Sequence, residues 1–401
     1  MKKYIIIISI LLFIGAGVLV YLYIDSYKIK VDNRYVVAKK DIILEIYEDY
    51  VFSDFIEITD GKLLGFKWFG TGKLGKDKAE ILYLNKHNRK RKAYVDYEVI
   101  DDVSPIILGG SSKTILKGDK SPIEYLLFSA DNYDSNPKRE IIGECDINNI
   151  GQYNLALKVT DSSNNVTSKD FVLNVIESFP ISIPSNTRTN YEDIFNTHKN
   201  ENNKIGLDIS KYQGEVDFNK LSENKVEFVM LRVGYQTDFN GTSEIDPYFY
   251  NNMEKLKGLN IPVGVYFHSY ATTTKEAHEQ ALWVLEKIKD YDISLPIVFD
   301  FESWDKFSSL KLSLHDINNI SRTFLSTIKS NGYQAMNYSS KFYLENIWDI
   351  SEYPVWLANY TSKTEYAGDY VMWQLCNNGK IDGINGAVDI DILYSLDIIR
   401  K

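Results

Sequence analysis

The stretch IVFDFE at residues 297–302 is a short apolar run that ends in two carboxylates. An apolar run of this length is typical of a strand that is buried on both faces. Side chains two positions apart on a strand point to the same side, so Asp300 and Glu302 are expected to project together. Because two close carboxyl groups among bulky apolar residues cannot both ionise easily, the pKa of one of them should be raised.

A carboxylic acid that stays protonated near neutral pH is what glycoside cleavage needs to protonate the leaving oxygen. The alternatives are a solvated acidic edge, or a metal site to which Asp208 and Asp389 would contribute. The apolar run before Asp300 argues against a solvated edge. The five histidines have no metal-ligand spacing, so the sequence favours catalysis, with no metal and no cofactor.

Working outward from this stretch, strand-like segments alternate with helix-like segments, and the later connections between strands look short and loop-like. Helical periodicity is clear at residues 248–259, 274–288 and 313–330. This alternation predicts an irregular (β/α)8-like barrel over residues 204–401. The eight strand-like runs are 205–209, 228–233, 263–267, 297–301, 334–338, 355–358, 371–375 and 387–392.

In a barrel of this kind, the functional site lies at the carboxyl ends of the strands. Polar or aromatic residues recur at that position in the sequence, which local propensity alone does not require. The residues gathered in this way are Asp208, Arg232, Tyr266, His268, Asp300, Glu302, Asn337, Tyr338, Trp356, Tyr360, Gln374 and Asp389.

Residues 205 to about 394 resemble glycoside hydrolase family 25, the Chalaropsis-type lysozymes or N-acetylmuramidases. Each matching piece is weakly specific, but together they are specific. In chain order they are GLDISKYQG with Asp208, FVMLRVGY with Arg232, VGVYFHSYA with Tyr266, IVFDFE with Asp300 and Glu302, NYSS with Tyr338, VWLANY with Trp356, MWQL with Gln374 and GINGAVDID with Asp389.

The resemblance implies that Glu302 is the general acid/base and that Asp300 stabilises positive charge while orienting the 2-acetamido group of the substrate. It implies that Asp208 and Asp389 line the catalytic subsite. The substrate-binding residues would be Tyr266, Tyr338, Trp356, Arg232 and Gln374, although Arg232 could instead simply neutralise the acidic barrel mouth. The sequence departs from the family at Asp391, where Asn is common, and at Leu375, where an aromatic residue is frequent.

The chain begins with Met-Lys-Lys and an uncharged run over residues 4–24. At about 1.5 Å per residue, this run matches a hydrocarbon core of about 30 Å. The sequence therefore predicts a transmembrane signal anchor at residues 1–25 with a cytoplasmic N-terminus. The predicted localisation is a single pass through the cell membrane of a Gram-positive-type bacterium, with the catalytic domain outside. A cleaved signal peptide is the alternative.

Residues 74–101 and 150–177 both read as a β-hairpin, and the second follows the first at a constant offset of 76 residues. The pattern is similar to the immunoglobulin-like modules of Gram-positive surface proteins. It predicts two all-β sandwiches at 32–102 and 103–177, interpreted as spacers rather than ligand-binding domains. Residues 178–203, with Pro180 and Pro184 among polar residues, read as a linker.

The formal net charge is −10, which disfavours a nucleic-acid partner. Together these features predict a multidomain, membrane-anchored cell-wall muramidase. Its expected partners are peptidoglycan glycan strands and, through the anchor, the membrane. Its substrate bond would be the β-1,4 link between N-acetylmuramic acid and N-acetylglucosamine. The alternatives are a catalytically weak wall-binding or adhesion protein, or a hydrolase of another N-acetylglucosamine polymer such as chitin.

Overall fold

The structure is a computed structural model that describes residues 29–67, 69–180, 187–239 and 241–394. The chain divides into two compact units, with the boundary between Val103 and Ser104. In the first unit, a sheet of order β1-β7-β6-β5, with β3 also paired to β7, accompanies the small β2-β4 sheet. The elements of this unit are β1 (Lys30–Val31), β2 (Val36–Ala38), β3 (Ile43–Glu45), α2 (Phe52–Phe55), β4 (Ile56–Ile58), β5 (Lys62–Phe66), β6 (Gly75–Leu84) and β7 (Lys90–Ile100).

The second unit opens with a β module of the same design, in which the sheet β11-β12-β13-β9 accompanies the small β8-β10 sheet. Both strands of its long hairpin begin and end 76 residues after those of the first hairpin, β6 and β7, so the predicted repeat is confirmed. The immunoglobulin-like assignment and the predicted domain boundaries stay predictions. The elements are β8 (Ile106–Leu108), β9 (Ser112–Leu116), η1 (Ile123–Tyr125), β10 (Phe128–Ala130), β11 (Lys138–Ile142), β12 (Gly151–Thr160) and β13 (Val166–Ile176).

Eight strands then close into a barrel, each at one of the predicted apolar runs. The order around the barrel is β15-β16-β18-β19-β20-β21-β22-β23, and β23 pairs back with β15. The strands are β15 (Lys204–Ile209), β16 (Val229–Gln236), β18 (Val263–His268), β19 (Ile297–Asp300), β20 (Ala335–Ser340), β21 (Val355–Ala358), β22 (Met372–Lys380) and β23 (Val388–Leu393).

The barrel departs from a regular (β/α)8 barrel at its last strand. β23 runs antiparallel to both β22 and β15, whereas the other neighbours around the barrel are parallel. Only residues 381–387 join β22 to β23. A parallel partner needs a crossover of a dozen or more residues, so this short connection can close only a hairpin.

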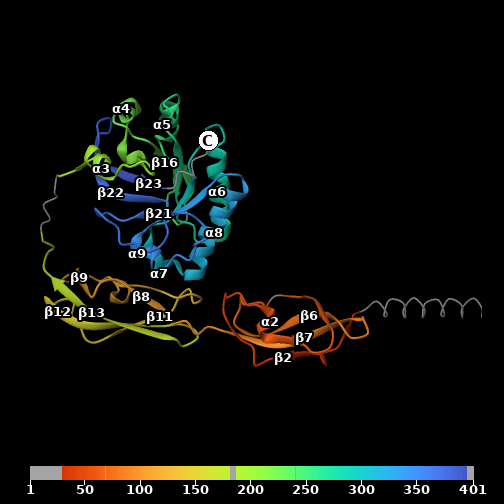
Figure 1. The fold of residues 1–401 in the computed structure, drawn as a ribbon. Coiled ribbons are helices and arrows are strands. Elements are labelled where there is room, and N and C mark those ends of the chain that lie inside the picture. Colours follow the sequence, from red (N-terminus) through yellow and green to blue (C-terminus); the bar gives the residue numbers. More distant parts are fainter. Residues whose placement is uncertain (1–28, 68, 181–186, 240, 395–401) are drawn as a thin grey trace, which may run out of the picture. The chain divides into compact units, whose positions relative to one another are not determined.

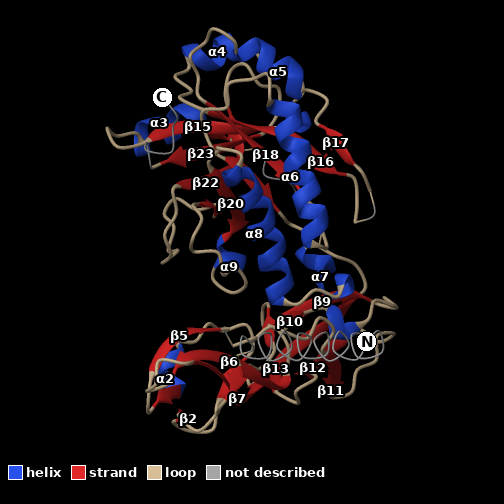
Figure 2. Ribbon diagram, turned by 90° about the vertical axis from the view of Figure 1, so that its right-hand side faces the viewer, coloured by secondary structure: helices blue, strands red, loops and turns tan. Residues whose placement is uncertain are grey.

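Helices cover the outside of the barrel, and α6 and α8 lie side by side there (Figures 1 and 2). Both begin with a capping box, Thr273 with Glu276 and Ser313 with Asp316, which satisfies N–H groups that a helix start leaves without partners. The remaining elements are η2 (Lys211–Gln213), α4 (Phe218–Glu223), β17 (Ser243–Ile245), α5 (Phe249–Leu256), α6 (Thr274–Ile288), η3 (Trp304–Lys306), α7 (Phe307–Leu310), α8 (Leu314–Ser330) and α9 (Lys341–Leu344).

Part of the predicted linker belongs to the folded barrel domain. Within residues 178–203, the structure has β14 (Thr189–Asn190), which pairs with β22, and α3 (Tyr191–His198). Tyr191 is buried, and its hydroxyl donates to the carbonyls of Ile205 and Lys225 at 3.1 Å. The polar composition of the segment suggested a linker, because Tyr191 is the one buried residue that holds this short helix on the barrel.

The predicted single-pass membrane localisation is corrected by the structure. Across residues 29–67, 69–180, 187–239 and 241–394, no helix combines the length and the apolar character that crossing a membrane requires. The anchor predicted for residues 1–25 lies outside the described residues. The sequence interpretation depended on the length and hydropathy of one run and on the lysines before it, and a signal peptide shares these features with a spanning helix.

Candidate active site

The inward-facing side chains of the barrel strands form an apolar plug, and the polar site residues follow directly above it. The plug contains Phe228, Met230, Leu295, Val298, Met336, Tyr338, Trp356, Ala358, Met372 and Leu393. Two positions after a plug residue, the chain places Arg232 on β16, Asp300 on β19 and Gln374 on β22. Side chains alternate along a strand, so these groups also point inward at the carboxyl end of the barrel.

A cavity of about 380 Å³ opens at this end of the barrel. Six of the residues that line it are among the predicted site residues: Asp208, Arg232, Tyr266, Asp300, Glu302 and Asp389. They come from five strands and from the segment after β19. The structure therefore brings together all four carboxylates that the sequence singled out.

Asp300 and Glu302 form a close pair with His268 on the neighbouring strand. One oxygen of each carboxyl group and one ring nitrogen of His268 lie within 4.8 Å of one another. Asp300 is buried at 3% exposure, and its pKa is raised well above the usual range by burial and by the charge of Glu302. Glu302 exposes part of its side chain, but its carboxyl group lies in the cavity, where lost hydration raises its pKa.

His268, Asp300 and Glu302 are also the residues of this cavity whose side chains lie close enough together to hold a metal ion. Burial, and then the charge of Arg232, lower the pKa of His268 to about 4, so its imidazole is neutral near pH 7. Two carboxyl groups with raised pKa values beside an arginine favour proton transfer over binding of a divalent cation.

Arg232 is held by a buried carboxylate rather than aimed freely into the cavity. Its Nε donates to Asp246 Oδ2 at 2.8 Å, and its guanidinium lies over the rings of Tyr212 and Tyr235 at 5.2 and 5.1 Å. Asp246 is 2% exposed and also accepts from the backbone N–H of Lys211. The charge of Arg232 favours the ionised forms of Asp300 and Glu302, which is the neutralising role considered from the sequence.

Asp208 and Asp389 face each other across the antiparallel pairing of β15 and β23. Tyr266 donates to Asp208 Oδ1 at 3.2 Å, and Gln374 Nε2 donates to both Asp208 Oδ2 and Asp389 Oδ2. Burial raises the pKa of Asp208 to about 6. Burial, and then the charge of Asp208, raise the pKa of Asp389 to about 9. At neutral pH this pair therefore holds one proton, mainly on Asp389.

Three predicted substrate-binding residues lie behind the cavity wall. Trp356 is 2% exposed, and its ring packs at 4.9 Å from that of Tyr338 and at 6.0 Å from that of Tyr266. The hydroxyls of Tyr338 and Tyr360 both donate to Gln374 Oε1 at 2.9 Å. Trp356, Tyr338 and Gln374 thus support the carboxylates in this structure, whereas Tyr266 reaches the cavity.

The cavity has a basic and aromatic side that was not assigned from the sequence. Lys211 and Tyr212 follow β15, and Tyr235 lies near the end of β16. Lys211 Nζ lies 4.4 Å from the ring centroid of Tyr235, and Tyr212 is 77% exposed. The rule that site residues follow the strand ends, which gathered His268, would also have found these three residues had it been applied past the last apolar residue of each strand.

Asp391 is a buried acidic residue beside the carboxylates of the site. It is fully buried, its Oδ1 accepts from Trp356 Nε1 at 2.8 Å, and burial, followed by the charges of Asp208 and Asp389, raises its pKa well above the usual range. The folded state therefore keeps a proton that the unfolded chain releases above a pH of about 4. The stability contributed by this group is complete at low pH and falls as the pH rises.

We expect Asp391→Asn, which keeps the acceptor for Trp356 but cannot ionise, to gain thermal stability relative to the wild type as the pH rises. Melting temperatures of both proteins, measured between pH 4 and pH 8, should diverge in favour of the variant. A difference that stays constant across this range would contradict the protonation of Asp391 in the folded protein.

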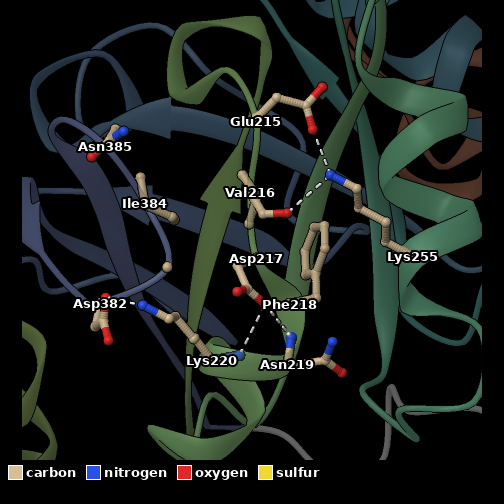
Figure 3. A pocket seen from close by; sticks show the side chains of 11 residues that line it. Glu215, Val216, Asp217, Phe218, Asn219, Lys220, Lys255, Asp382, Ile384 and Asn385 are labelled. Atoms are coloured by element: carbon tan, nitrogen blue, oxygen red, sulfur yellow. Dashed lines mark hydrogen bonds and ion pairs between the residues drawn. The ribbon is translucent and has the colours of Figure 1, made fainter.

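A larger cavity, of about 660 Å³, lies outside the barrel mouth beside α4 and the 381–387 connection (Figure 3). Its charged groups pair with each other, Lys255 with Glu215 and Lys220 with Asp382 (Figure 3). These pairs lower the pKa values of both carboxyl groups. Carboxylates that are ionised and neutralised in this way offer no acid for proton transfer, so the smaller cavity is the candidate active site.

The model of glycosyl hydrolases family 25 matches residues 207–384. An uncharacterized protein of Escherichia coli strain K12, YegX, is 27% identical over 191 residues, which cover 47% of this chain and 68% of that protein. The autolytic lysozyme of Clostridium acetobutylicum is 26% identical over 190 residues, which cover 46% of this chain and 54% of that enzyme.

Among solved structures, the chain is similar to the modular autolysin LytC from Streptococcus pneumoniae in complex with a synthetic peptidoglycan ligand. The TM-score is 0.43 at 27% sequence identity, and the match covers 60% of this chain and 56% of that chain. The chain thus spans little more than half the length of LytC and of the autolytic lysozyme.

Proposed function

Residues 207–384 form a domain of glycosyl hydrolases family 25, and on this premise we propose that the chain is a muramidase. It hydrolyses the β-1,4 bond between N-acetylmuramic acid and N-acetylglucosamine in peptidoglycan. The observation that carries the proposal is the Asp300–Glu302 pair at the cavity, with the pKa values of both groups raised. The similarity to a protein named autolytic lysozyme supports a cell-wall substrate.

Glu302 is the general acid/base in this proposal. Its carboxyl group is the member of the pair that reaches the open side of the cavity. Burial raises the pKa of both groups, so the pair resists losing its last proton, and Glu302 is the member placed to deliver that proton to a substrate. It donates its proton to the glycosidic oxygen as the bond to the leaving sugar breaks. The resulting carboxylate then removes a proton from the water that completes hydrolysis.

Asp300 is the charge stabiliser. It is buried directly beside Glu302, so it is less accessible than Glu302 to a leaving-group oxygen. When the glycosidic bond breaks, positive charge develops at the anomeric carbon. The proton that Asp300 shares with Glu302 leaves the pair through Glu302 to the glycosidic oxygen, and the resulting Asp300 carboxylate stabilises that positive charge. In a substrate with a 2-acetamido group, the same carboxylate accepts the amide N–H and orients the amide oxygen as an internal nucleophile.

Asp208 and Asp389 contact the sugar bound at the cavity, and Tyr266 and Gln374 fix their oxygens. Tyr266 also contacts the substrate from the cavity wall. Tyr338 and Trp356 pack behind these groups. Arg232 lines the cavity and balances the charge of the carboxylates.

We expect hydrolysis with retention of the anomeric configuration. Inverting glycosidases hold their two carboxyl groups about 6.5–9.5 Å apart, so that a water fits between acid and base. The nearest atoms of Asp300 and Glu302 lie within 4.8 Å, which leaves no such room. Proton NMR of the first products from a soluble glycan fragment should show the β-anomer before mutarotation, and an initial α-anomer would refute this mechanism.

The proposed function is tested by digesting purified peptidoglycan with the full chain, reducing the products with borohydride and identifying the ends by mass spectrometry. Reduced N-acetylmuramic acid ends are expected. Reduced N-acetylglucosamine ends would assign the other glycosidic bond. Co-sedimentation with the wall but no release of fragments would favour the wall-binding alternative, and faster cleavage of chitin oligomers than of peptidoglycan would favour the other-polymer alternative.

A further inference from the structure

A segment of the second β module, residues 128–132, is buried against the barrel domain within the same compact unit. Phe128 packs against the rings of Trp304, Phe307 and Tyr343, with centroid distances of 6.4, 5.3 and 6.3 Å. Ala130 is 2% exposed and belongs to the same apolar cluster as the barrel helices. The module therefore shares a hydrophobic core with the barrel instead of only being tethered to it.

The same segment completes the start of α8. The backbone N–H groups of Leu314 and His315 donate to the carbonyls of Asp131 and Asn132, at 2.7 and 3.2 Å. These are first-turn N–H groups for which the helix itself has no acceptor. The capping box of Ser313 and Asp316 satisfies other groups at this end, so the cap of α8 is built jointly by the barrel domain and the module.

The part of the barrel that the module contacts is the segment that follows Asp300 and Glu302 in the chain. Glu302 lies two residues before Trp304, and the Trp304 N–H donates to the Glu302 carbonyl at 2.8 Å. The Trp304 ring stacks on Tyr343 at 4.3 Å and meets Phe301 edge-on at 5.0 Å. Phe301 is the residue between Asp300 and Glu302, so a continuous line of packed rings runs from Phe128 to the catalytic pair.

The module holds its side of this contact rigidly. Arg139 on β11 donates from Nε to Ser129 Oγ at 2.8 Å and from its terminal nitrogen to the Ser129 carbonyl at 3.1 Å. The Asp131 side chain accepts from the backbone N–H groups of Tyr133 and Asp134 at 3.0 and 2.6 Å. The carbonyls that cap α8 therefore come from a fixed turn, not from a loose loop.

We propose that the second β module positions Glu302, with Phe128 and the carbonyls of Asp131 and Asn132 fixing residues 301–316 between the module and the barrel. The module is thus a working part of the catalytic domain and not a spacer. This inference rests on the proposed function, because it assigns a position-sensitive role to Glu302. Phe128 is a positioning residue, since it touches neither the cavity nor the carboxylates.

The test compares the full-length wild type with Phe128→Ala, Phe128→Leu and Ile142→Ala. Ile142 is an apolar residue of the same module that is 53% exposed, so its truncation controls for loss of an apolar side chain elsewhere. In Phe128→Ala we expect kcat on soluble glycan fragments to fall about tenfold to a hundredfold, because small misplacements of catalytic groups have effects of this size. KM should change less than twofold, Phe128→Leu should restore most of kcat, and Ile142→Ala should match the wild type.

Hydrogen exchange provides a readout that does not depend on activity. In Phe128→Ala the amides of residues 301–316 should exchange faster, including those of Leu314 and His315, while those of the barrel strands keep their protection. If Phe128→Ala does not fold, Phe128→Val takes its place with the same expected direction. A folded variant with wild-type kcat and wild-type exchange in this segment would overturn the proposal.

The two proposals can fail separately. A wild type without hydrolytic activity would overturn the proposed function, and unchanged exchange in residues 301–316 of the variant would overturn the positioning contact in the same samples. An active wild type whose Phe128→Ala variant exchanges faster but keeps its kcat would show that Glu302 does not depend on the contact, which also overturns the inference.

Discussion

Glu302→Gln is expected to lower the rate of peptidoglycan hydrolysis about 10²- to 10⁴-fold, the range over which a positioned general acid contributes. Gln has nearly the same shape as Glu but cannot donate a proton to the glycosidic oxygen. The variant should keep the melting temperature of the wild type, because Glu302 is at the cavity surface and its loss removes no core packing. Release of muropeptides, followed over time, measures the effect.

Asp305→Asn is the matched control for this substitution. Asp305 lies three residues further along the same segment and is exposed, but it does not line the cavity. It should leave the rate unchanged. A Glu302→Gln variant that retains more than a tenth of the wild-type rate would exclude Glu302 as the acid.

A substrate with an activated leaving group separates the two steps in which Glu302 acts. A nitrophenyl glycoside of an N-acetylglucosamine oligomer releases nitrophenolate, a stable anion that leaves without being protonated. If Glu302 is the acid, the variant should lose much less activity on this substrate than on peptidoglycan. An equal loss on both substrates would mean that Glu302 has another function.

Asp300→Asn is expected to lower the rate about 10²- to 10³-fold, the size of effect seen when one preorganised electrostatic contact to a transition state is removed. Asn preserves the volume of this buried residue but cannot stabilise positive charge at the anomeric carbon. Unlike the loss in Glu302→Gln, this loss should be the same on peptidoglycan and on the nitrophenyl substrate, because charge develops with either leaving group.

Comparison of the two variants on the two substrates therefore assigns both roles. If Asp300→Asn is rescued by the nitrophenyl group and Glu302→Gln is not, the assignments of acid and stabiliser must be exchanged. Since burial raises the pKa of Asp300, the Asn variant should also be at least as stable as the wild type near neutral pH. A strongly destabilised variant would instead indicate that Asp300 holds the fold together.

The catalytic pair could be predicted from the sequence because its geometry is local. Alternation along a strand predicted residues 300 and 302 on one side, and the apolar run before them identified the strand as buried. β19 ends at Asp300, but the two carboxyl groups still lie close together just past its end. The same holds for α6, whose start at Thr274 follows a capping box that is visible in the sequence. Asp208 and Asp389 were gathered by the rule that site residues lie at the strand ends, and only their role at the catalytic subsite came from the family resemblance. Their pairing across β15 and β23 confirms that they are neighbours.

Other features depend on contacts between distant segments, which periodicity does not encode. Trp356 and Gln374 are buried behind the cavity wall, where Trp356 donates to Asp391 and Gln374 bonds to Tyr338 and Asp208, all on other strands. The contact of Phe128 with Trp304 joins segments more than 170 residues apart, in a module that was interpreted as a spacer. Polar Asn190 and Asp193 around one buried tyrosine, Tyr191, made the start of α3 look like a linker.

The amide of Gln374 fixes which groups donate and which accept in the hydrogen bonds beneath the cavity. Its oxygen accepts from two phenols, and its nitrogen donates to two carboxylates. The reverse orientation would set the amide oxygen against the ionised carboxylate of Asp208, so the observed orientation is favoured. A primary amide does not relay protons, and Gln374 therefore insulates the proton shared by Asp208 and Asp389 from Tyr338 and Tyr360. The cavity, which Asp208, Asp389 and Tyr266 line, is the open side from which the charge of that pair can change.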